Sequence, residues 1–146
     1  HHPILGINCR LDTFQAAILL AKLEIFADEI LRRQKVAPAY GDGFRNSSVT
    51  LPRVGPGNTS VFAQYTILSS NRDALAASLK EAGIPSVSYY AVPLHLQPVF
   101  DGLGCKKGQF PVTEDVASRG LSLPMNPYLS GEEVAAVCDV IVSAEG

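Results

Sequence analysis

The sequence predicts an α+β fold: a small, mainly antiparallel sheet with helices on one face, preceded by a long helix that forms an interface. Three observations support this fold class. Residues 12–37 show helical periodicity on two faces, and short strand-like and helix-like segments alternate after them. The chain has 146 residues, enough for one domain with its own core.

The composition excludes some partners. The formal net charge is −2 with both signs scattered, which argues against nucleic acid or an anionic membrane as partner. The longest apolar run, 16–26, contains Lys22 and Glu24, so we expect no membrane span. No signal peptide is recognisable, and we expect a cytoplasmic protein. The opening His1 and His2 are either a tag remnant or native residues of a longer chain.

The three cysteines, Cys9, Cys105 and Cys138, are far apart and form no CxxC or Cys/His cluster. This spacing argues against a zinc site and a disulfide framework. We expect three free thiols in a reducing compartment.

The first predicted helix begins at Asp12, a good N-cap with Gln15 three residues later. Its apolar residues form two stripes, which are Phe14, Ala17, Ile18, Ala21 and Ile25, and Leu20, Leu23, Phe26 and Ile30. A helix with two apolar stripes is buried on more than one side, so it needs another domain or chain. Pro38 is expected to end or kink it.

Residues 41–146 are expected to form a β-α-β-α-β-α unit. Strands are predicted at 61–68, 86–91 and 121–123, with a further short one allowed at 49–51. Helices are predicted after Asn71, bearing Leu75 and Leu79 and ending at Gly83, and from Thr113 to Arg119. Ser130 and Glu133 form a capping box for the last helix, whose inner face carries Val134, Val137 and Ile141. A loop is expected at 93–108.

Common catalytic motifs are missing: the sequence has no GxSxG, Walker loop, HExxH or Rossmann fingerprint. His95 is the only histidine away from the N-terminus, and no serine or cysteine near it suggests a triad. The residues alone therefore indicate an α+β domain with one helix that needs a partner.

Two segments resemble a known family. Residues 2–17, HPILGINCRLDTFQAA, resemble the G-x-N-x-R-x-D-x-x-Q-A-A signature of the DegT/DnrJ/StrS sugar aminotransferases. Gly83-Ile84-Pro85 with 89–98, YYAVPLHLQP, resembles that family's G-I-x-x-x-x-H-Y-x-x-P-L-H segment. Supporting matches follow in family order at 64–67, 71–73, 110–112, 121–127 and 129–133.

The resemblance implies a fold-type I enzyme that uses pyridoxal 5′-phosphate (PLP). Residues 1–146 would be its C-terminal small domain, with 1–40 as the motif and connecting helix, and the N-terminal domain with the PLP lysine would be absent. The whole enzyme would be a homodimer with sites at the subunit interface. It would transfer an amino group, from glutamate, to a keto group of a nucleotide-linked sugar in amino-sugar or polysaccharide biosynthesis. The likeness is greatest to enzymes that aminate a 3-keto sugar.

The resemblance also implies site residues. Asn8 would bind the PLP phosphate of the neighbouring subunit, the alternative being a turn residue. Arg10 would bind the sugar-nucleotide or a phosphate through its planar guanidinium group, the alternative being a salt bridge to Asp12 or another acid.

Three further residues are predicted on the substrate side. Tyr90 matches the tyrosine of the H-Y pair, although a core aromatic on a strand is an equal alternative. Tyr89 replaces the family's usual histidine, which puts a direct substrate contact there in doubt because a phenol does not titrate near neutral pH. His95 matches the PLH histidine.

No catalytic residue is assigned in this chain. Its five lysines are predicted on helix surfaces or in a loop pair, and they are Lys22, Lys35, Lys80, Lys106 and Lys107. The alternative function is a free-standing, non-catalytic module that binds a small ligand or another protein.

Overall fold

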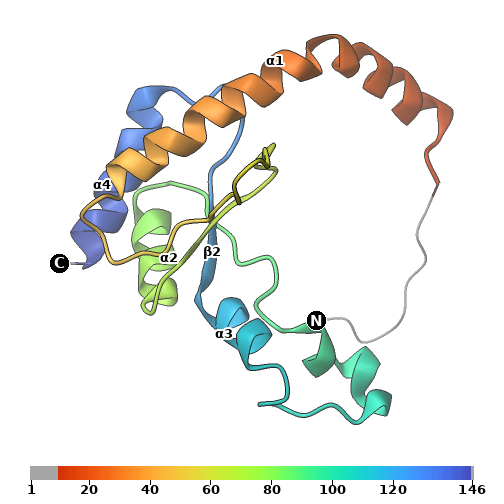
Figure 1. Cartoon of the computed structure of the whole chain (residues 1–146), viewed down its shortest axis with the longest axis vertical. Helices are drawn as coiled ribbons and strands as arrows, with labels where there is room; N and C mark the ends of the chain where they lie inside the picture. The colour runs from red at the N-terminus through yellow and green to blue at the C-terminus, as the bar shows by residue number, and fades with distance from the viewer. Residues whose placement is uncertain (1–9, 146) are drawn as a thin grey trace.

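The computed structural model describes residues 10–145 and has an α+β architecture, as predicted. The long helix α1 (Thr13–Gly43) precedes strand β1 (Tyr65–Leu68) and helix α2 (Arg72–Glu81). Two 3-10 helices, η1 (Leu94–Leu96) and η2 (Pro98–Leu103), come next. Helix α3 (Pro111–Arg119), strand β2 (Gly120–Leu123) and helix α4 (Gly131–Glu145) complete the order (Figure 1).

The sheet is antiparallel and smaller than predicted. β1 pairs with β2 so that Thr66 lies opposite Ser122. Single bridges extend the sheet on both edges: Thr50 pairs with Leu68, and Val87 pairs with Ser122. The segments 49–51 and 86–91 therefore contribute one bridge each, and the prediction of a strand over 86–91 is wrong.

The predicted strand at 61–68 also begins late, at Tyr65, because of the backbone at Phe62. Phe62 has φ +44°, a left-handed conformation that does not continue a strand. Its N–H donates to Ser60 Oγ at 3.1 Å, and its carbonyl accepts from Arg33 Nη1 at 3.1 Å. Its backbone groups thus bond to side chains rather than to a neighbouring strand.

One side of the sheet carries the core. Figure 1 shows α2, α4 and the C-terminal part of α1 on one side of β2, and most core residues come from these helices and the two strands. Those that are buried completely or nearly so are Tyr40, Ile67, Leu75, Leu79, Leu121 and Ile141. The predicted inner face of the last helix is confirmed, since Val134, Val137 and Ile141 are all buried. Thr66 and Ser122 point to the opposite side, where their hydroxyl oxygens lie 2.8 Å apart.

Helix α1 runs through Pro38 to Gly43, so of the two predicted effects of this proline, an end or a kink, the end is wrong. The reason is the packing of its last turns. Tyr40 is fully buried, stacks on Tyr65 with ring centroids 4.9 Å apart, and donates a hydrogen bond from its hydroxyl to the Pro124 carbonyl at 2.8 Å. Burial of this kind outweighs the lost amide hydrogen bond of a helical proline.

The N-terminal half of α1 projects beyond the other elements (Figure 1). Phe14 and Ile18 are 85% and 59% exposed, and the large apolar residues Leu20, Leu23 and Phe26 of the other stripe are exposed as well. Asp12 caps the helix as predicted, with its Oδ1 accepting from the Gln15 N–H at 2.8 Å. The apolar surface that required a partner is therefore uncovered in this chain. None of the helices among residues 10–145 is long and apolar enough to cross a membrane.

Local capping signals identify several helix ends. Ser130 and Glu133 form the predicted reciprocal capping box at α4. Gly83 follows α2 with φ +72°, as expected for a C′ glycine. Asn71 stands at the N-cap of α2 without a side-chain capping bond. Helix α3 begins at Pro111 rather than after Thr113, because proline suits the first helical position.

Candidate functional site

Tyr89 and Tyr90 lie in a turn that follows the bridge between Val87 and Ser122. This turn, the Thr66–Ser122 side of the sheet and helix α3 enclose a cleft of about 300 Å³, the tyrosine cleft. Tyr89 and Tyr90 are 56% and 72% exposed, so neither is a core aromatic. The core alternative for Tyr90 is therefore wrong, and both phenols are available at the cleft.

Hydroxyl groups dominate the polar atoms of this cleft, and none of the charged side chains within residues 10–145 lines it. The hydroxyl-bearing residues are Thr66, Ser88, Tyr89, Tyr90, Thr113 and Ser122. Gln64 adds an amide, while Val112, Val116 and Ala117 of α3 supply an apolar wall. Hydroxyls, an amide and aromatic faces suit a neutral polyhydroxylated ligand better than an anion.

Arg72 fixes the start of the tyrosine turn. Its Nη1 donates to Ser88 Oγ at 2.8 Å, which ties the first turn of α2 to the residue before Tyr89. Its Nε lies 2.5 Å from Asp73 Oδ1 as an ion pair, although the geometry does not make a hydrogen bond. The turn is thus held by one backbone bridge and one arginine.

His95, on η1, lines a second cavity of about 410 Å³ next to the first. Tyr90 and Thr113 line both cavities, so the structure brings Tyr89, Tyr90 and His95 into one region. The His95 side chain is only 11% exposed, and its Nε2 lies 3.1 Å from Glu114 Oε1. It is the least accessible of the three predicted residues.

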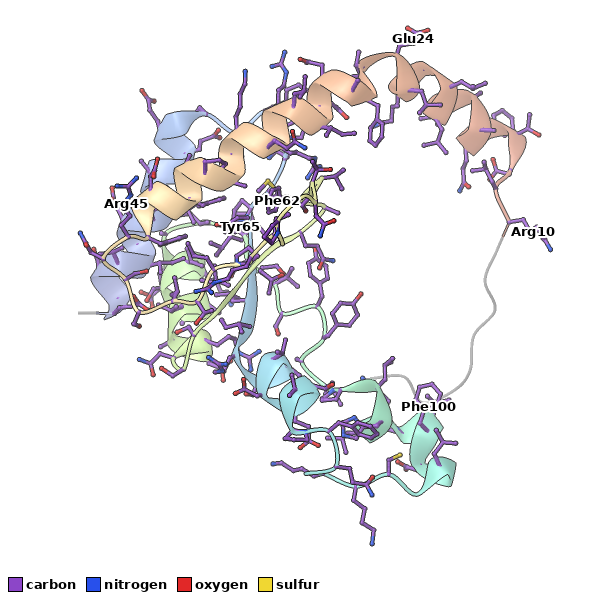
Figure 2. All side chains as sticks on the ribbon, viewed as in Figure 1. Arg10, Glu24, Arg45, Phe62, Tyr65 and Phe100 are labelled. Atoms are coloured by element: carbon purple, nitrogen blue, oxygen red, sulfur yellow. The ribbon has the colours of Figure 1, made fainter. Side chains whose placement is uncertain are left out.

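Arg10 lies elsewhere. Figure 2 shows it at the free end of α1, far from Phe62 and from Tyr65, the first residue of β1. It is exposed, and neither an ion pair to Asp12 nor one to any other acid is found for it among residues 10–145. Asn8 and its predicted phosphate contact lie outside the described residues. Within one chain, Arg10 and the tyrosine cleft do not form a common site.

The described residues of this chain do not make a PLP site by themselves. All five lysines are exposed, and in the described part of the chain neither a lysine nor an arginine lines the tyrosine cleft. A Schiff-base lysine needs a fixed position over the cofactor, and a phosphate needs cations or free N–H groups. Between residues 10 and 145, no group of three histidine, cysteine or acidic side chains is placed to bind a metal.

Sequence reasoning missed Arg72 and Glu114. Both belong to segments that match the family pattern or adjoin it, but no role was predicted for either. Pro111 with Glu114 three residues later is a helix-start signal. That signal does not reveal a histidine partner nineteen residues earlier in the chain.

Several curated proteins are similar to this chain over nearly all of its length. An aminotransferase of UDP-2-acetamido-2-deoxy-3-oxo-D-glucuronate from Pseudomonas aeruginosa is 43% identical over 98% of this chain. A pleiotropic regulatory protein from Geobacillus stearothermophilus is 44% identical over 97% of it. This chain spans only 39% of each of these relatives.

Solved structures agree with this likeness. A DegT DnrJ EryC1 StrS aminotransferase from Brucella abortus is 46% identical, with a TM-score of 0.86 over 97% of this chain and 38% of its own. DesV from S. venezuelae, solved with a ketimine intermediate, is 32% identical, with a TM-score of 0.89 over 100% of this chain and 40% of its own. The sequence model of the DegT/DnrJ/EryC1/StrS aminotransferase family matches residues 1–142, and the chain belongs to that family.

Proposed function

We propose that this chain is the substrate-side, C-terminal part of an aminotransferase that acts on a nucleotide-linked sugar. The observation that carries the proposal is the uncharged cleft at Tyr89 and Tyr90, a mostly apolar surface whose polar groups are hydroxyls and one amide, found in a member of this family. Sugar hydroxyls exchange hydrogen bonds with such groups, and aromatic faces pack against sugar rings. The relative from Pseudomonas aeruginosa is named for a 3-oxo sugar, which supports a 3-keto sugar as the acceptor.

The cofactor of the full-length protein is proposed to be PLP, with glutamate as the amino donor. The Schiff-base lysine would come from sequence outside this chain, because none of the five lysines here lines the cleft. Asn8 and Arg10 are proposed to act at the PLP phosphate and the sugar-nucleotide of a second subunit. Arg10 does not line the cleft of its own chain, which supports a role at a different site from that of Tyr90.

The exposed apolar half of α1 supports the proposed homodimer and a large N-terminal domain as its partners. Phe14 lies on one stripe and Leu20 and Leu23 lie on the other, and each is more than half exposed. A surface of this kind on a helix marks an interaction site. The proposed cellular location is the cytoplasm.

The test uses the natural full-length protein. We expect it to transfer the amino group of glutamate to a UDP-linked 3-keto sugar, with the amino sugar and 2-oxoglutarate appearing in equal amounts. Replacing Tyr90 by Phe removes a hydroxyl from the cleft and should raise the KM for the sugar but not for glutamate. A protein that binds PLP but aminates no nucleotide-linked keto sugar would contradict the proposal.

A second candidate is a non-catalytic module that binds a small ligand or a protein. The exposure of all five lysines favours it for the chain on its own, and one relative is named as a regulatory protein. Mixing residues 1–146 with PLP and removing free cofactor separates the two cases. If one lysine of this chain forms a stable aldimine with PLP, the chain is not a non-catalytic module. The same result would contradict the proposal that the Schiff-base lysine lies outside this chain.

A further inference from the structure

His95 and Glu114 join two segments that the sequence separates, η1 and the first turns of α3. Nε2 of His95 lies 3.1 Å from Oε1 of Glu114, and the two side chains are 11% and 14% exposed. The imidazole also packs on the Phe110 ring, with centroids 4.7 Å apart. The His95 ring is therefore held on one side by an acceptor and on another by an aromatic face.

The carboxylate of Glu114 is an acceptor for several groups at once. The Gly108 N–H donates to its two oxygens at 2.8 and 2.9 Å, and the Phe110 N–H donates at 3.4 Å. Burial alone would raise the pKa of Glu114, but the hydrogen bonds from Gly108, His95 and Phe110 outweigh it and lower the pKa. An ionised carboxylate accepts only, so His95 donates from Nε2.

These contacts anchor a segment that has little other regular structure. Between residues 93 and 110 the chain contains only two short 3-10 helices. Tyr90 lies just before this segment, and Val112 and Thr113 of α3 lie just after it on the wall of the tyrosine cleft. The attachment of the segment to Glu114 therefore fixes the separation between two walls of that cleft.

We propose that His95 and Glu114 are positioning residues, which together set the geometry of the tyrosine cleft without His95 touching the substrate. The proposal rests on the cleft being the substrate site of the proposed function. It replaces the sequence-based assignment of His95 as a substrate contact. The reason is that its donor nitrogen is committed to Glu114, while Tyr89 and Tyr90 present more accessible groups.

A double-mutant cycle in the natural full-length protein tests this. His95→Phe keeps a ring against Phe110 but removes the donor, and Glu114→Ala removes the acceptor. Each change should raise the KM for the keto sugar about tenfold. The double variant should show the same rise of about tenfold, because both changes break the same hydrogen bond between His95 and Glu114. An additive rise of about a hundredfold in the double variant would show that the two side chains act independently, which would overturn the proposal.

Two controls make the test specific. His95→Gln retains an N–H at a similar reach and should raise KM less than His95→Phe does. Glu133→Ala removes a carboxylate that caps α4 away from the cleft, so it should lower the melting temperature without changing KM. Equal KM values for His95→Gln and His95→Phe would contradict the proposed role of the His95–Glu114 hydrogen bond. If either variant of the cycle fails to fold, His95→Asn and Glu114→Gln replace them.

A different measurement separates this proposal from the proposed function. If the wild-type protein transfers no amino group, the proposed function fails, and the pair is then judged by hydrogen exchange. Loss of the His95 donor should speed exchange of the Gly108 amide at least severalfold relative to the wild type. If the Gly108 amide exchanges at the wild-type rate in His95→Phe, the proposed positioning role of His95 and Glu114 is wrong, whether or not the protein transfers an amino group.

Discussion

Gly43 approaches Cys138 so closely that no side chain fits between them. A Cβ added to Gly43 would overlap Cys138 Sγ and lie 2.9 Å from the Cys138 Cβ. The last turn of α1 packs against α4 at this point, and Cys138 is buried there. The crossing of the two helices therefore depends on a glycine.

Replacing Gly43 by Ala should destabilise the protein by about 1–3 kcal/mol, because an inserted methyl group forces the helices apart. Gly41 is the matched control, since it lies in the same turn and a Cβ added there would have no neighbour within 4 Å. Gly41→Ala should be neutral or stabilise by up to about 1 kcal/mol through helix propensity. Urea unfolding compares the two. Equal midpoints would contradict the close crossing, and adding Cys138→Ala should recover part of the loss.

The sequence was informative where the signal is local. Asp12, Gly83 and the Ser130–Glu133 box mark helix ends through bonds within one turn, and all three predictions are confirmed. Leu75 and Leu79, the apolar residues of the second predicted helix, are likewise found in the core.

Prediction failed where distant residues decide. Pro38 stays helical because Tyr40 binds Pro124, far along the chain. Residues 61–64 leave the sheet because Arg33 bonds to the Phe62 carbonyl. At the candidate site, the tyrosines were predictable from the family pattern, but the His95–Glu114 contact depends on how segment 93–110 folds back on α3.

The free energy of unfolding should fall at alkaline pH, because the core contains a phenol and a thiol that are buried in their protonated forms. Burial, with a smaller contribution from Cys138, raises the pKa of Tyr65 to about 12 from its ordinary value of 10.0. Burial, helped by the charge of Asp139, raises the pKa of the Cys138 thiol to about 11 from 9.0. Above these ordinary values the unfolded chain loses protons that the folded chain keeps. The free energy of unfolding therefore decreases as the pH rises.

The stabilisation should be complete below about pH 9 and be lost progressively up to about pH 12. Denaturant unfolding at several pH values measures the slope. Cys138→Ala should flatten the part between pH 9 and 11, and Tyr65→Phe the part between pH 10 and 12. A stability that stays constant to pH 12 would show that these groups titrate alike in both states.

Arg72 should affect substrate affinity although it does not line the cleft. Arg72→Met keeps an apolar stem but removes the hydrogen bond to Ser88, so the turn carrying Tyr89 and Tyr90 is freer to move. We expect the KM for the keto sugar to rise about tenfold with a smaller change in kcat, as for the loss of one hydrogen bond to a charged group. Arg45→Met is the matched control because Arg45 pairs with Asp42 on the surface. A KM that rises equally in both variants would indicate a general loss of stability.

Asn8 and Arg10 should act across a subunit interface in the full-length enzyme. Arg10 is exposed and does not line the tyrosine cleft of its own chain, so we expect it to serve the site of a second copy. Asn8→Ala should remove one charge-assisted hydrogen bond to the PLP phosphate and cost roughly 1.5–3 kcal/mol of cofactor binding. Arg10→Ala should weaken binding of the sugar-nucleotide while PLP is retained.

Mixing two inactive variants tests this arrangement. One variant lacks the Schiff-base lysine, and the other carries Asn8→Ala with Arg10→Ala. After subunit exchange, a mixed dimer has one site with the lysine from one subunit and the intact 8–10 motif from the other. Activity should then return, up to half the wild-type value per mixed dimer, because one of its two sites is complete. Exchanged dimers that are confirmed by mass and remain inactive would place Asn8 and Arg10 in the same site as the lysine of their own chain.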